Sequence, residues 1–128
     1  MLIAAIGDAH IGSDGFSELR RADFIRQFDH AILRAVEYGA ACIVLLGDVF
    51  DRTIDAGDER WWETCVAEVA CSLERPRRLG IRVFAVPGNN DQQSCPSYQG
   101  LLQLADEGYL TILDDAAILL NNIWLCGI

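Results

Sequence analysis

The chain has 128 residues, which suits a single domain spanning residues 1–128. It is 52% apolar and 23% charged, which excludes a disordered segment, and its apolar runs fall short of the roughly 20 residues that a membrane span needs. The formal net charge of -9 argues against a broad surface that tracks nucleic-acid phosphates, but a phosphate substrate held by metal ions stays compatible with it.

The cysteines and the N-terminus indicate a cellular compartment. Five cysteines are scattered along the chain without a Cys-x-x-Cys pair. This pattern is typical of reduced thiols rather than of a disulfide framework or a cysteine-based zinc site. Met1 leads directly into an apolar run, with no basic start or cleavage site before it, so no signal peptide is expected. The sequence therefore predicts a cytoplasmic protein.

The chain begins with an alternation of strand and helix patterns. Short unbroken apolar runs are typical of strands buried on both faces, and three are present, at residues 1–6, 41–46 and 81–86. Between them, residues 18–38 and 59–79 carry apolar side chains at the spacing of one helix face. Pro76 is expected to break or kink the second of these helices.

The remainder of the chain predicts shorter elements. A short helix is expected near residues 98–105. Two or three strands are expected in the tail, joined by tight turns at Asp114-Asp115 and Asn121-Asn122, because aspartate and asparagine favour turns. The strand segments are residues 110–113, 116–120 and 123–128.

The alternation predicts an α/β fold built on a βαβαβ parallel sheet with flanking helices. Right-handed crossovers between neighbouring strands place both helices on the same face of that sheet. The other face is then an exposed apolar surface, which usually marks an absent partner. We therefore expect either a homodimer or a second polypeptide that covers the exposed sheet face.

Each of the three predicted strands is followed by glycine and by side chains that bind metals. The segments are Gly7-Asp8-Ala9-His10, Gly47-Asp48-Val49-Phe50-Asp51 and Gly88-Asn89-Asn90-Asp91. The carboxyl ends of parallel strands meet at one edge of a sheet, where open α/β folds bind ligands. Carboxylate, imidazole and amide groups suit Mn²⁺, Zn²⁺ or Fe²⁺, and a pair of such ions activates water for attack at phosphorus.

These segments resemble, in order, the D-x-H, G-D-x-x-D and G-N-H-D motifs of the calcineurin-like metallophosphoesterases. The first two segments are most similar to the SbcD-type DNA repair exonucleases. The resemblance covers the whole chain but only the N-terminal half of the family domain, a four-layer αββα fold. It implies a hydrolase that cleaves a phosphodiester or phosphomonoester with metal-activated water.

The resemblance also implies a metal site. Asp8 and His10 would bind the first metal ion, Asp48 would bridge two ions, and Asn89 would bind the second. Asp51 would be a supporting residue. The family uses two divalent ions, of which manganese is the expected one here and zinc or iron the alternatives.

Two departures from the family pattern bear on catalysis. Asn90 occupies the position of the family's catalytic histidine, which Asp91 would orient, and asparagine has no proton to give near neutral pH. The family also takes histidine ligands from its C-terminal half, whereas this chain has no histidine after His30. Activity of this chain alone is therefore left open. The alternative function is a catalytically impaired remnant that serves as a metal-binding or protein-interaction module.

The same residues also allow a purely structural role, without metal binding or catalysis. Pro-Gly-Asn-Asn-Asp is also ordinary turn chemistry, so a plain turn is an alternative for Asn89 and an equally good one for Asn90. Asp51 fits a solvated loop as well as a supporting role. Asp8, His10 and Asp48 are each compatible with turn or cap positions when taken singly, and only their combination predicts a metal site.

Overall fold

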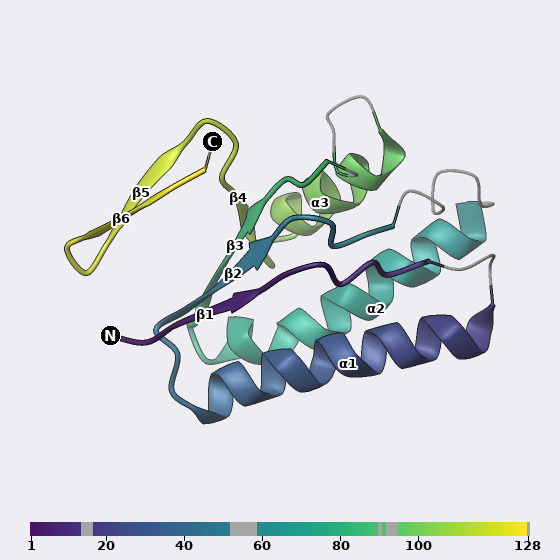
Figure 1. The fold of residues 1–128 in the computed structure, drawn as a ribbon, viewed down its shortest axis with the longest axis horizontal. Coiled ribbons are helices and arrows are strands. Elements are labelled where there is room, and N and C mark those ends of the chain that lie inside the picture. The colour runs from purple at the N-terminus through teal and green to yellow at the C-terminus, as the bar shows by residue number, and fades with distance from the viewer. Residues whose placement is uncertain (14–16, 52–58, 90, 92–94, 128) are drawn as a thin grey trace.

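Alternating strands and helices make up most of the computed structural model, which describes residues 1–13, 17–51, 59–89, 91 and 95–127 (Figure 1). The elements in chain order are β1 (Ile3–Ile6), α1 (Glu18–Glu37), β2 (Cys42–Leu46), α2 (Glu59–Arg78), β3 (Arg82–Val86), α3 (Pro96–Asp106), β4 (Thr111–Ile112), β5 (Ala117–Leu120) and β6 (Ile123–Cys126). The predicted elements are therefore confirmed, with boundaries that differ by a few residues.

The first four strands form one parallel sheet in the order β1-β2-β3-β4. Ala5 lies opposite Val44, which lies opposite Phe84, so the three long strands are in register. The predicted parallel βαβαβ unit is confirmed, and β4 extends it at the β3 edge. All four strands consequently end at the same edge of the sheet.

All three helices pack on one face of this sheet, which holds the main core (Figure 1). Alternate residues of the central strands face the helices and are almost fully buried: Ile43, Leu45, Val83 and Ala85. Phe28 and Ile32 of α1 belong to the same cluster. Burying each of the larger of these side chains contributes about 1.5–3 kcal/mol, so this layer fixes the sheet that carries the strand ends.

The opposite face is covered in part by the antiparallel β5–β6 hairpin (Figure 1). Ile118 and Leu125 of the hairpin pack on Phe84 and Leu113 in a second, smaller core. The prediction that this face is wholly uncovered is therefore wrong for β3 and β4, because alternate hairpin residues supply an apolar surface for them. The face stays open at Leu46, which is 54% exposed.

The hairpin turn and the second helix show two local outcomes. Asn121 and Asn122 both have positive φ, as a two-residue hairpin turn requires, which confirms the predicted turn. Of the predicted break or kink at Pro76, the break is wrong, since α2 continues to Arg78, and the kink stays a prediction. Proline cannot donate a hydrogen bond to the Ser72 carbonyl, but Pro76 lies in the last turn, so only two residues of the helix follow it.

Strand β1 is the free edge of the sheet. Within the described residues it pairs only with β2. Its sequence, Ile-Ala-Ala-Ile, carries no charge and no proline, two features that often protect an exposed edge, and its four residues make it a short strand. Among the described helices none is long and apolar enough to cross a membrane.

Substitution of Phe84 by alanine tests the packing of the hairpin on the sheet. Phe84 is fully buried in the second core, so Phe84→Ala is expected to lower the free energy of unfolding by about 3–5 kcal/mol in urea titrations. The matched control is Leu119→Ala, on the exposed side of the hairpin, with a change below about 0.5 kcal/mol. Equal effects of the two changes would contradict this packing.

Candidate metal centre

Backbone hydrogen bonds tie the loop after β1 to the loop after β2. The His10 N–H donates to the Asp48 carbonyl and the Ile11 N–H to the Val49 carbonyl, each at 2.9 Å. The Asp51 N–H returns a bond of 2.9 Å to the Ile11 carbonyl. These bonds continue the parallel pairing beyond the strands, so the first two motifs lie side by side.

Three residues of these loops have a left-handed backbone. The φ angle is 53° at Asp8, 47° at His10 and 47° at Asp48. This conformation costs an L-residue other than glycine about 1–2 kcal/mol and persists only where the surroundings enforce it. Here the loop ladder enforces it. Three such residues in one place indicate a functional site.

The side chains of the same three residues converge. One ligand atom from each of Asp8, His10 and Asp48 lies within 4.8 Å of the other two. His10 Nε2 is 3.8 Å from Asp8 Oδ1. Ligand atoms around one ion bound at about 2.0–2.2 Å lie some 3–4.5 Å apart, so the spacing suits a single ion with little rearrangement. Asp8 is exposed, His10 is half-buried and Asp48 is buried, which leaves the group open to solvent on one side.

His10 is oriented through its other ring nitrogen. Nδ1 lies 3.0 Å from Asp51 Oδ2, and the Asp51 side chain is only 18% exposed. A carboxylate only accepts hydrogen bonds, so this contact assigns the proton to Nδ1 and leaves the Nε2 lone pair facing Asp8. Sequence reasoning named Asp51 as a supporting residue but did not identify its partner, which is 41 positions away.

The third motif comes close to the second through two glycines. A Cβ atom placed on Gly88 would lie 2.5 Å from Asp48 Oδ1 and 2.6 Å from the Asp48 nitrogen. One placed on Gly47 would lie 2.8 Å from the Gly88 Cα atom. Only glycine allows this approach. Asn89 follows Gly88 directly and is exposed, while Asn90 lies outside the described residues.

Asp91 is fully buried beneath this contact. The Gly88 N–H donates to Asp91 Oδ2 at 3.2 Å, and the Asp91 N–H donates to the Gly88 carbonyl at 3.1 Å. Burial raises the pKa of the Asp91 carboxyl and the charge of Asp48 adds to the rise, while backbone amides of Gly88, Asp48 and Val49 oppose it. Asp91 therefore braces the third loop against the second. Its orientation of residue 90 stays a prediction.

Two comparisons with known proteins bear on this site. The model of the calcineurin-like phosphoesterase family matches residues 1–126. The DNA double-strand break repair protein Mre11 of Archaeoglobus fulgidus is 34% identical over 95 residues, which are 73% of this chain and 20% of the relative. The matched stretch thus spans about a fifth of the length of that curated relative.

Substitution of Gly88 tests the contact between the second and third loops. In Gly88→Ala the new methyl group meets the carboxylate and the backbone of Asp48, so affinity for Mn²⁺ is expected to fall at least about tenfold, as after loss of a supporting contact. Gly39→Ala is the control, because Gly39 has positive φ and open space around it. It is expected to cost about 1 kcal/mol of stability and to leave Mn²⁺ affinity unchanged. A calorimetric titration with each variant decides, and unchanged binding in Gly88→Ala would contradict the contact.

Proposed function

The chain belongs to the calcineurin-like phosphoesterase family, and we propose that it is a metal-dependent enzyme that hydrolyses a phosphodiester or phosphomonoester with metal-activated water. The observation that supports this most directly is the convergence of Asp8, His10 and Asp48 at the strand ends. The donor set fits a divalent ion, since it combines two carboxylates with an imidazole whose Nε2 is free to coordinate.

We assign the ligands as follows. Asp8, His10 and Asp48 would hold the first ion, and Asp48 and Asn89 would hold a second. Manganese is the proposed metal because oxygen ligands dominate the set, with zinc or iron as alternatives. A divalent ion in this place, when bound, lowers the pKa of coordinated water and stabilises negative charge on phosphate oxygens.

The remaining site residues act on these ligands and on the substrate. Asp51 holds His10 in the tautomer that coordinates. Asp91 keeps Gly88, and with it the start of the third motif, against Asp48. Asn90 is proposed to donate an amide hydrogen bond to a phosphate oxygen. An amide transfers no proton near neutral pH, so the leaving group has to take its proton from solvent.

The proposed substrate class is supported by the matched relative and is compatible with the net charge. The matched relative is a DNA double-strand break repair protein, which supports a nucleic-acid ester and a nuclease-like reaction. The net charge of -9 limits attraction between this chain and the phosphates of a duplex, so we place the main phosphate contact at the metal centre.

Exposed apolar side chains support the proposal that a partner polypeptide takes part in this activity. Leu46, Leu119 and Trp124 are exposed on the strands of the hairpin-bearing side. We propose that a second polypeptide or a second copy of the chain covers this surface. Further metal ligands would then come from that polypeptide.

All five cysteines are free thiols, which supports a reducing compartment such as the cytoplasm.

Metal binding is the first test of this proposal. A calorimetric titration of the chain with Mn²⁺ is expected to show saturable binding, and Asp48→Asn is expected to abolish it because one buried carboxylate is lost from the group. Asp106→Asn, an exposed change at the end of α3, is the control and should bind as the wild type does. Hydrolysis of bis(p-nitrophenyl) phosphate in Mn²⁺ should follow the same order. Equal binding by wild type and Asp48→Asn would exclude this metal site.

Asp51 provides a second test. Asp51→Ala removes the acceptor for His10 Nδ1, so Mn²⁺ affinity is expected to fall about 10–100-fold, as for other residues that orient a ligand. Asp51→Asn keeps an accepting oxygen and should restore part of that loss. Nitrogen NMR of His10 reports the tautomer directly. A ring that carries its proton on Nδ1 in both the wild type and Asp51→Ala would argue against this role.

A further inference from the structure

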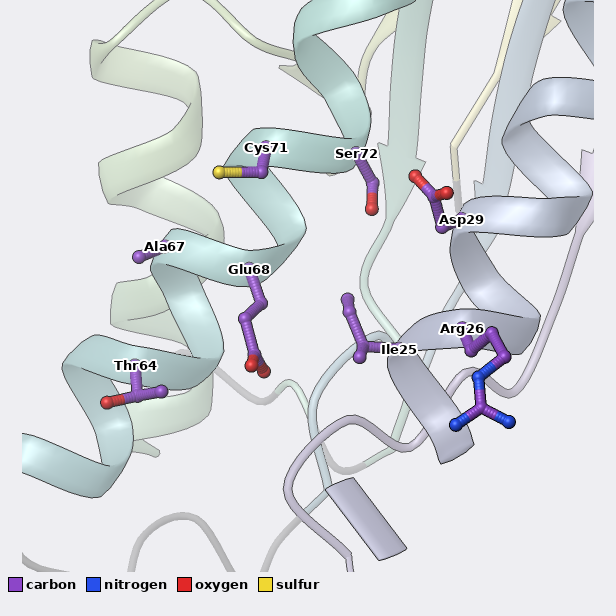
Figure 2. Close-up of a pocket in the computed structure, with 8 residues that line it drawn as sticks. All are labelled: Ile25, Arg26, Asp29, Thr64, Ala67, Glu68, Cys71 and Ser72. Atoms are coloured by element: carbon purple, nitrogen blue, oxygen red, sulfur yellow. The ribbon is translucent and has the colours of Figure 1, made fainter. Parts of the chain in front are cut away.

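A groove of about 540 Å³ runs between α1 and α2, on the helical layer of the fold (Figure 2). The residues that line it are Ile25, Arg26 and Asp29 of α1, and Thr64, Ala67, Glu68, Cys71 and Ser72 of α2. None of the metal-centre residues lines it. The groove is therefore a separate surface with its own chemistry.

The α2 wall of this groove is made of small and weakly polar side chains. Thr64, Ala67 and Cys71 follow one another at intervals of three and four residues, so they share one face of the helix. Ala67 and Cys71 are exposed, on a surface where a solvated helix usually carries charge. Ile25 adds apolar surface from α1. Small side chains along a helix let a further helix approach closely.

At one end of the groove the charges are already paired. Arg21 Nε lies 3.0 Å from Glu68 Oε2, with both side chains largely buried. The Arg21 guanidinium also lies over the Trp61 ring, 4.8 Å from its centroid. Arg26 pairs with Asp23 at 3.4 Å. These contacts leave little charge on this end for an incoming group.

The other end offers two polar groups that lack partners among the described residues. Asp29 is exposed and forms no ion pair or hydrogen bond there. Ser72 is only 6% exposed, and its hydroxyl has no hydrogen-bond partner in the described ranges. Figure 2 shows both side chains turned toward the gap between the helices. A carboxylate beside a hydroxyl suits an ammonium or guanidinium group, which brings several N–H donors and a positive charge.

We propose that this groove docks a basic amphipathic helix of a partner protein. Its apolar stripe lies on Ile25, Ala67 and Cys71, and a lysine or arginine reaches Asp29 and Ser72. The groove is open and runs along two long parallel helices, which suits a helix laid into it. The net charge of -9 favours a basic partner by long-range attraction.

Cys71 makes the proposal testable, because it lines the groove and is exposed. The probe is a synthetic helical peptide of about 18 residues, roughly five turns, with a leucine stripe flanked by lysines. A maleimide labels exposed thiols, and mass spectrometry reads each cysteine separately. Bound peptide is expected to slow labelling of Cys71 at least about fivefold. The rate at Cys126, exposed on β6, should stay the same. Cys65 is silent in the assay, since burial raises the pKa of its thiol to about 11.

Matched variants identify the chemistry of the contact. Asp29→Asn is expected to weaken the peptide about fivefold, the size of a partly exposed charge pair, whereas Asp106→Asn leaves the affinity unchanged. Ala67→Lys places bulk and positive charge in the groove and is expected to abolish protection of Cys71. A peptide with glutamate in place of lysine is expected not to bind.

Three results would overturn the proposal: equal protection of Cys71 and Cys126, equal effects of Asp29→Asn and Asp106→Asn, or equal binding of the glutamate peptide. Each would show that the peptide binds to acidic or apolar surface in general and not specifically to this groove. Asp29→Asn should keep the Mn²⁺ titration of the wild type, because the groove and the metal centre share no residue. Failure of the docking proposal is thus distinguishable from failure of the proposed metal-dependent activity.

Discussion

The hydrogen bonds that carry the sheet past the ends of β1 and β2 are the constraint on which the site depends. They join His10 and Ile11 to Asp48 and Val49 at 2.9 Å, and they hold non-glycine residues in a left-handed backbone. Without that ladder the two loops would relax to ordinary turns and their side chains would diverge. The apolar layers on both faces of the sheet matter to function chiefly because they keep the strands beneath this ladder in register.

Much of the fold and most of the site residues were predictable from local patterns. Apolar runs located the strands, helical spacing located the helices, and the glycine-plus-carboxylate endings located Asp8, His10 and Asp48. The resemblance added Asp51 without its partner. The pairing of Asp51 with His10 spans 41 positions and leaves no local signal in the sequence.

Other features escaped prediction because they depend on the way in which distant segments meet. The near contact of Gly47 with Gly88 depends on how two crossovers bring β2 and β3 together. Placement of the hairpin over Phe84 depends on which face of the sheet lacks a helix, and the tail alone carries no such information.

A local feature was also misjudged. Pro76 was judged by its usual effect in a helix interior, whereas it lies in the last turn. Residue 90 lies outside the described ranges, so its role rests on the motif alone.

The edge strand β1, which lacks charge and proline, has a consequence for contacts between molecules. Among the described residues Ile3 to Ile6 pair with no strand on their outer side, and their apolar side chains carry no charge to repel a like strand. Such an edge is a template for adding another strand, and crowding of molecules favours that addition. Another strand can therefore add at β1 while each molecule keeps its fold. A lysine in place of Ala5, whose side chain is exposed, gives the edge the charge that it lacks.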